Sequence, residues 1–549
     1  MTSLPVVRPV RTTIALVLVL LGMGAVSAAA APAASCRGSG SPSPNVGSGD
    51  NSLLGVAATS TCNAWAVGYY MSAAVEKTLI EHWNGKAWKV QKSPDPSTSS
   101  YNELYSVAAD SPSDAWAVGE YKQGSVYKAL LEHWNGKSWK VQKIPTPSTG
   151  DNELFGVAAT SPSDAWAVGE YEKGSVSKAL VEHWNGKQWK VQKSPDVAGS
   201  QNILDAVSAR SSSDAWAVGF DETSSAPQTL IEHWNGKTWK IQKSSNPSSF
   251  DALDGVAALS AKAALAVGGI GFGNQTLVER SDGKGWKTQA SPNPSPDYDD
   301  LLGVAAVSPS DAWAVGYMGN PDQPLIEHWN GKAWAVQKTP SPSTGQTQLS
   351  GVAALSRSDA WAVGYYYDGV ADRTLIERWN GKAWETKAPA DELDQEQTDT
   401  SGGLSVISST DSWAQTFTAG RSGLLDRVKL YLEASSSAGE TEPVTVELTT
   451  TSGGSPTSTV LASSTIPAAS VSASGGWAQA KFSPAPPVSA GTQYAIVAYS
   501  SSTYYWIEAP TNDYAGGGPF LSNSSPPSSW QPYSTGDDQA FKTYVIPGG

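Results

Sequence analysis

Short apolar runs separated by turn-forming residues recur along most of this chain. In the first copy of the pattern the runs cover residues 54–58, 64–68, 78–83 and 88–92. Runs of this length are typical of strands and are too short for ordinary helices. Ser, Pro, Asp and Asn-Gly pairs stand between the runs, and Asn-Gly is a strong hairpin signal. The pattern therefore predicts four short antiparallel strands joined by turns.

The four-run pattern is repeated seven times between residues 53 and 388. A Trp in the second run marks each copy except the fifth, which has Leu in its place. The marker residues are Trp65, Trp116, Trp166, Trp216, Leu265, Trp313 and Trp361, spaced 48 to 51 residues apart. Repeats of this length form arrays whose units bury their apolar faces against one another. We predict a seven-bladed β-propeller of four-stranded blades, with a linear solenoid as the alternative.

The repeat ends before an acidic polar stretch, residues 389–402, which we interpret as a linker. Residues 403–549 contain about eight short alternating segments separated by Ser, Gly and Pro. This pattern predicts a β-sandwich, jelly-roll-like, as an accessory domain. The expected fold class is all-β.

The start of the chain has the features of an export signal. Arg8 and Arg11 precede an apolar run and a stretch of small residues, which predicts a signal peptide over residues 1–34. No other segment is apolar enough to span a membrane. A tail over residues 35–52 follows, and the two cysteines of the chain, Cys36 and Cys62, are expected to form a disulfide in an exported protein. We predict a secreted, extracellular protein.

Charge and histidine content narrow the possible functions. The net charge of −14 argues against nucleic-acid binding, which needs a basic surface. All five histidines occupy one position of the repeat: His82, His133, His183, His233 and His328. We interpret them as scaffold residues, so we expect no metal and no cofactor.

The repeat unit resembles that of secreted bacterial propellers of the BNR, or Asp-box, kind. It is also similar to the propeller of the photosystem II assembly factor family. The best match to the Asp-box turn is residues 281–286, SDGKGW, whereas the other copies have Asn for Asp and lack one residue before Gly. Sialidases share that propeller, and the resemblance implies three arginines that grip a carboxylate. We find no motif in this chain that corresponds to them. The C-terminal segments resemble accessory sandwich domains of secreted bacterial proteins and carbohydrate-active enzymes.

The variable segments after the second run, together with the links between copies, are expected on one face of the propeller. Loops that differ between copies are where a rigid scaffold most easily builds a specific site. The candidate ligand-binding residues of this face are Tyr69, Tyr70, Glu120, Tyr121, Glu170, Tyr171, Phe220, Asp221, Tyr317, Tyr365 and Tyr366. The candidates in the sandwich are Tyr504, Trp506, Tyr514, Trp530 and Tyr533.

Aromatic rings beside carboxylates suit sugar stacking or a basic protein partner. Our first hypothesis is a non-enzymatic recognition protein that binds a glycan or an extracellular protein. The second is a glycoside hydrolase or lyase with a propeller catalytic domain. The third is an extracellular structural or assembly protein. The sequence does not choose among ligands or oligomeric states.

Overall fold

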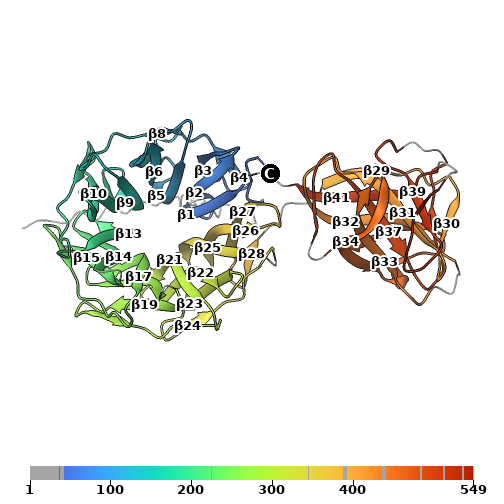
Figure 1. Cartoon of the computed structure of the whole chain (residues 1–549). Helices are drawn as coiled ribbons and strands as arrows, with labels where there is room; N and C mark the ends of the chain where they lie inside the picture. The colour runs from blue at the N-terminus through green and yellow to red at the C-terminus, as the bar shows by residue number, and fades with distance from the viewer. Residues whose placement is uncertain are drawn as a thin grey trace, which may run out of the picture. The chain divides into compact units, whose positions relative to one another are not determined.

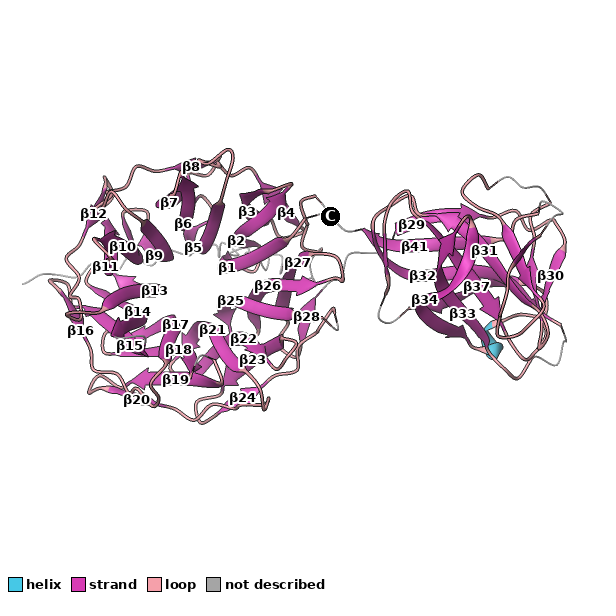
Figure 2. Cartoon of the chain, in the orientation of Figure 1, coloured by secondary structure: helices cyan, strands magenta, loops and turns pink. Residues whose placement is uncertain are grey.

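The computed structural model describes residues 36, 42–47, 49–223, 226–271, 273–343, 345–386, 392–435, 440–482, 485–510, 514–533 and 537–547. The predicted signal peptide lies outside the described residues. Nearly all regular structure is β (Figure 2). Among these residues no helix is long and apolar enough to cross a membrane.

Seven four-stranded antiparallel sheets make up the repeat region, each with its strands in sequence order. The first strands are β1 (Asn51–Ser60), β5 (Asn102–Ser111), β9 (Asn152–Ser161), β13 (Gln201–Ser211), β17 (Asp251–Ser260), β21 (Asp299–Ser308) and β25 (Thr347–Ser356). The second strands are β2 (Asn63–Ser72), β6 (Asp114–Gln123), β10 (Asp164–Lys173), β14 (Asp214–Thr223), β18 (Ala263–Ile270), β22 (Asp311–Met318) and β26 (Asp359–Tyr367). The third strands are β3 (Val75–Trp83), β7 (Val126–Trp134), β11 (Val176–Trp184), β15 (Ala226–Trp234), β19 (Gln275–Ser281), β23 (Gln323–Trp329) and β27 (Asp372–Trp379). The fourth strands are β4 (Trp88–Gln91), β8 (Trp139–Val141), β12 (Trp189–Val191), β16 (Trp239–Ile241), β20 (Trp286–Thr288), β24 (Trp334–Val336) and β28 (Trp384–Thr386).

The sheets form a ring in which each is one blade of a β-propeller (Figure 1). Each first strand contacts the first strand of the next sheet, and β25 contacts β1. The Trp of six second strands, and Leu265 of the fifth, packs into the following blade. Trp65, for example, is completely buried and meets Trp139 edge to face at 5.1 Å between ring centroids. Trp361 makes the same contact with Trp88 at 5.2 Å, which joins the last blade to the first.

The turn between the third and fourth strands is a four-residue loop rather than a two-residue hairpin. In the first blade Trp83 pairs with Trp88. The Oδ1 atom of Asn84 accepts hydrogen bonds from the amides of Lys86 and Ala87 at 3.0 and 3.1 Å. Gly85 has a φ of +86°, in the left-handed region that favours glycine. The Asn-Gly pair thus marks the right place, and the Asn side chain itself closes the turn.

The N-terminal tail completes the ring by acting as a seventh link between blades. In the ordinary link after the first blade, Asp95 Oδ1 accepts a hydrogen bond from the amide of Thr78 at 3.0 Å. Asn45 Oδ1 in the tail accepts the equivalent bond from the amide of Thr374 in the last blade at 2.9 Å. The tail therefore holds the last blade against the first.

A disulfide and an arginine hold the start of this tail. Cys36 and Cys62 are bonded, as predicted. Arg378 forms a salt bridge with Asp359 at 2.8 Å and donates from Nη1 to the carbonyl oxygen of Cys36 at 2.6 Å. Arg378 occupies the repeat position that is His in five copies, so this blade uses that position for ring closure.

The C-terminal part contains two antiparallel sheets that share one apolar core. One sheet contains β29 (Glu392–Gln397), β30 (Leu404–Ile407), β32 (Gly423–Ala434), β35 (Gly476–Lys481), β36 (Pro487–Val488), β38 (Tyr504–Ile507) and β41 (Phe541–Pro547). The other contains β31 (Ser412–Thr418), β33 (Val444–Ser452), β34 (Ser455–Ile466), β37 (Gln493–Tyr499), β39 (Pro519–Ser522) and β40 (Gln531–Pro532). A short 3-10 helix, η1, covers Ala468–Ser470. Both sheets contribute to one buried cluster, for example Leu430 and Phe541 from the first and Leu448 and Ile496 from the second.

One boundary differs from the sequence interpretation. Residues 389–402 were expected to be a linker, yet Glu392–Gln397 form β29 and pair with β41. Their acidic and amide side chains suit an edge strand, where charge discourages pairing with another chain. The C-terminal sheet therefore begins inside the stretch that looked like a linker.

Candidate functional site: a cavity at the centre of the ring

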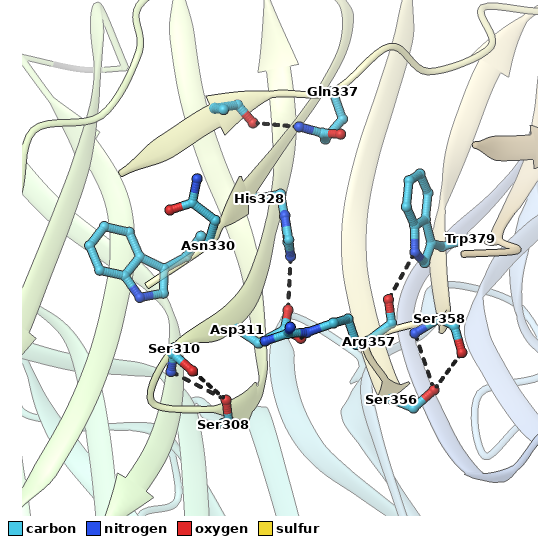
Figure 3. Close-up of polar contacts among 12 residues, drawn as sticks. Ser308, Ser310, Asp311, His328, Asn330, Gln337, Ser356, Arg357, Ser358 and Trp379 are labelled. Atoms are coloured by element: carbon cyan, nitrogen blue, oxygen red, sulfur yellow. Dashed lines mark hydrogen bonds and ion pairs between the residues drawn. The ribbon is translucent and has the colours of Figure 1, made fainter. Parts of the chain in front are cut away.

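The histidines are part of the scaffold rather than of a reactive site. Each His stacks on the Trp of its own second strand, with ring centroids 3.9 to 4.2 Å apart. Each His Nε2 lies 2.6 to 2.9 Å from an Asn or Asp oxygen at the start of the same strand. Figure 3 shows the sixth copy, where Asp311 lies between His328 and Arg357 of the next blade. Because the arrangement recurs in five blades, it serves folding.

A β-bulge in every first strand faces the centre of the ring instead. The strand register shifts once near the middle of each first strand, so one residue there has no partner in the second strand. A bulge redirects a side chain out of the regular alternation. The seven bulged residues all line a cavity of about 190 Å³: Leu54, Tyr105, Phe155, Asp205, Asp254, Leu302 and Ser350. The lining combines this bulged position, which carries five kinds of side chain in seven blades, with the small residues and valines that follow it.

The cavity has an aromatic side and an acidic side. Tyr105 and Phe155 lie on neighbouring blades, with ring centroids 5.5 Å apart. Asp205 and Asp254 follow on the next two blades. A ligand in this space would meet rings on one side and carboxyl groups on the other.

More carboxyl and phenol groups lie beside the bulges on the first and second strands. Glu103 pairs across the sheet with Glu120, and Glu153 with Glu170. Tyr105 Oη donates to Glu120 Oε1 at 3.3 Å, which connects the cavity lining to these acids. Asp300 pairs in the same way with Tyr317, whose Oη lies 3.5 Å from Asp300 Oδ2. The acidic group therefore extends over several consecutive blades.

Burial raises the pKa of these carboxyl groups. It raises the pKa of Glu120 to about 7, that of Glu153 to about 8 and that of Asp205 to about 7. The charge of Glu120 raises the pKa of Glu153 further, and that of Glu170 does the same for Asp205. The pKa of Asp254 is also well above its ordinary value, first through burial and then through Asp300. Glu120, Glu153 and Asp205 therefore lie close to the point where they gain or lose a proton near neutral pH.

No positive charge compensates these acids within the part of the chain that is described. None of its ion pairs includes Glu103, Glu120, Glu153, Glu170 or Asp205. The cavity lining contains no Lys, Arg or His. Burying carboxylates without a partner costs stability. The described residues also contain no group of three or more His, Cys, Asp or Glu arranged to hold a metal ion.

The predicted residues of the variable face separate into two rows, because side chains alternate along a strand. One row lies on the second strands and pairs with first-strand residues that stand two positions before the bulge: Tyr69, Glu120, Glu170, Phe220, Tyr317 and Tyr365. The side chains of the other row point to the opposite side of the sheet. Tyr70, Tyr121, Tyr171 and Tyr366 pack against the apolar clusters between blades, and Asp221 accepts a hydrogen bond from Ser200 at 3.0 Å.

Sequence reasoning missed the acids and rings of the first strands: Glu103, Tyr105, Glu153, Phe155, Asp205 and Asp254. A signal was present in the repeat. Three residues before the Ala-Ala pair, which is Ser-Ala in the fourth copy, the chain reads Leu, Tyr, Phe, Asp, Asp, Leu and Ser in successive copies. A position that packs the core keeps similar side chains in every copy. This position varies inside an otherwise uniform strand, which marks it as a position outside the core.

In the C-terminal part the predicted aromatic residues do not form one surface. Tyr504 and Trp506 are completely buried, so the prediction that they bind a ligand is wrong. Tyr514 and Tyr533 pack partly on the same core. Trp530 lines a separate cavity of about 350 Å³ together with Tyr499 and Glu447. Tyr499 Oη donates to Glu447 Oε1 at 2.9 Å, which holds a ring and a carboxylate side by side.

Comparisons with known proteins leave the activity of this chain open. No protein-family model matches the chain, and no curated protein matches it. Among solved structures it is similar to YCF48 bound to a D1 peptide, with 13% identity, a TM-score of 0.35 and coverage of 54% of this chain and 85% of the other. It is similar to the GH74 xyloglucanase of Xanthomonas campestris, with 13% identity, a TM-score of 0.42 and coverage of 67% and 59%. It is also similar to an ulvan lyase of family PL25, with 11% identity, a TM-score of 0.41 and coverage of 61% and 96%. These neighbours are β-propellers with differing activities, and none of them assigns an activity or a ligand to this chain.

Proposed function

We propose that this protein is a secreted recognition protein that binds a glycan or an extracellular protein at the centre of a seven-bladed β-propeller. The proposal rests on the cavity lining, where seven bulged residues on a uniform scaffold are of five kinds and combine rings with carboxyl groups. A scaffold position has no reason to vary in this way, whereas a specific ligand needs unlike contacts on different sides.

The C-terminal part would act as a β-sandwich accessory domain, jelly-roll-like, that binds cell-wall or environmental glycan. Trp530 and Tyr499 supply rings, and Glu447 supplies a hydrogen-bond acceptor in the same cavity. Such a combination suits a sugar, which stacks one face and hydrogen bonds at its edge. This module would anchor the protein while the propeller engages its own ligand.

A polysaccharide pull-down with the full chain tests both sites. Tyr105→Ala and Phe155→Ala together should reduce binding at the propeller, whereas Tyr298→Ala, at an exposed link residue, should not. Trp530→Ala should reduce retention by insoluble glycan at least tenfold. Trp477→Ala is the matched control, because Trp477 is 37% exposed and lies on β35, in the other sheet. Equal retention of all variants would contradict the proposal.

A glycoside hydrolase or lyase is the second candidate function. Two acidic residues on adjacent blades, Asp205 and Asp254, line one cavity and have raised pKa values. Glycosidases use carboxyl pairs in different protonation states as acid and base. Release of reducing or unsaturated sugar ends by the full chain, lost in Asp254→Asn, would favour this function over simple binding.

A further inference from the structure

We propose that the central cavity binds the cationic side chain of a lysine or arginine carried by an extended segment of a partner protein. The inference rests on the proposed function, namely that the cavity is a ligand site, and it names the chemical class of that ligand.

The first argument is that buried acceptor oxygens here lack donors. Glu120 is only 5% exposed, and its Oε2 atom accepts no hydrogen bond from a described donor group. The neighbouring carboxyl of Glu153 can donate to Glu120 only while it holds a proton. Asp205 Oδ2 and Glu170 Oε2 are likewise buried without a donor. Buried polar atoms in folded proteins are usually satisfied. Asp205 lines the cavity, so a guest in that space can supply the donor that its Oδ2 atom lacks.

The second argument is the direction of the side chains. Asp205 and Asp254 are bulged residues, which brings both into the cavity lining. Tyr105 is bulged as well, and its hydroxyl contacts Glu120. The carboxyl groups of Asp205 and Asp254 thus line one space from two adjacent blades, and Tyr105 connects that space to Glu120, so one guest can reach more than one acid.

The third argument is the shape and polarity of the space. Its volume of about 190 Å³ suits one long side chain and not a folded surface. Leu54, Leu302 and Phe155 contribute apolar lining beside the acids. Lysine and arginine have an apolar stem and a charged tip, and they also interact favourably with aromatic faces. The net charge of −14 would attract a basic partner before it docks.

Isothermal titration of the full chain with hexalysine at pH 8 and near-physiological salt tests the proposal. Asp205→Asn and Glu120→Gln should each weaken binding by about tenfold or more, because each removes a charge-assisted hydrogen bond. Asp297→Asn is the matched control, since Asp297 is an exposed link residue and the variant has the same net charge. A hexapeptide of acetyl-lysine should not bind.

The melting temperature of each variant shows whether it is folded. Both cavity variants should melt at a higher temperature than the unmodified protein at pH 8, because each removes a buried charge that lacks a partner. If either variant does not fold, Asp254→Asn takes its place. Equal hexalysine affinity in Asp205→Asn and Asp297→Asn would overturn the proposal, since binding would then reflect general surface charge.

A glucosamine hexamer provides the arm that distinguishes an amino sugar from a peptide. If it binds more tightly than hexalysine and with the same dependence on Asp205, the assignment to a protein partner is overturned. If neutral glycans bind in a manner that depends on Tyr105 while hexalysine binding is unaffected by the acids, this inference fails and the proposed function stands. If no ligand depends on the cavity, both fail.

Discussion

Replacing Cys36 and Cys62 with Ser should open the ring at the contact between the last and first blades. The disulfide closes a loop with a sequence separation of 26 residues, which contains the whole tail and β1. The chain-entropy model gives a stabilisation of about 3.5 kcal/mol for a loop of that length. The loss should be local, because the contacts of the tail are with the last blade and the first, for example with Thr374 and Glu81.

Hydrogen exchange of individual backbone amides is the appropriate measurement. The amide of Thr374 is bonded to Asn45 in the tail, and the amide of Thr78 is bonded to Asp95 in an ordinary link. A loss of about 3.5 kcal/mol should speed exchange at Thr374 several-hundredfold. Exchange at Thr78 should change little, which makes it an internal control.

Two results would refute this reasoning. Exchange at Thr374 that accelerates less than about fivefold would show that the tail is held without the disulfide. Equal acceleration at Thr78 and Thr374 would show that the disulfide stabilises the propeller as a whole and not its closing contact. Reduction of the unmodified protein should reproduce the behaviour of the double variant.

Three further predictions concern buried charges. Arg378→Gln should lower the free energy of unfolding by about 3–5 kcal/mol, because Asp359 is left buried without its partner. Arg357→Ala should lower it by less than about 1 kcal/mol, because the Arg357 side chain is 75% exposed. Urea titration followed by tryptophan fluorescence compares the two variants. Ser194→Ala should destabilise by about 1–3 kcal/mol above pH 8, since Ser194 donates to the completely buried Glu232, and by less at pH 6, where a protonated Glu232 needs that donor less. The melting temperature of the propeller should fall as the pH rises from 5.5 to 8.5. Burial raises the pKa values of the third-strand glutamates, several to about 8, so the folded state binds more protons than the unfolded state in this range. A melting temperature that rises with pH would contradict this.

The sequence predicted the scaffold well because the same physical problem is solved seven times. Each copy must bury a Trp between blades and end its third strand in an Asn-Gly turn, or in Asp-Gly in the fifth copy, so the pattern averages over seven examples. It missed the link in the tail for the opposite reason. Ser43-Pro44-Asn45 matches Ser291-Pro292-Asn293 of an ordinary link, but it stands apart from any repeat, in a stretch read only as a tail.

The candidate site was predicted in part. Alternation along a strand places Tyr69 and Tyr70 on opposite sides, and the sequence pattern does not say which side faces the centre of the ring. The bulges are also invisible in the pattern, since a bulged Asp205 and a paired Asp205 have the same neighbours in sequence. Tyr504 and Trp506 of the C-terminal part were assigned wrongly for a related reason. Trp506 donates its Nε1 hydrogen to the carbonyl of Ala540 at 2.8 Å, so a polar ring is satisfied inside the core.

The closing link has a consequence for how the chain folds during synthesis. Asn45 is made early, but its partner Thr374 emerges 329 residues later. Until then the tail has only its neighbours in the first blade, where Cys62 can already capture Cys36. The first blade therefore holds the tail before the last blade exists, and the ring closes only after the seventh repeat has been synthesised.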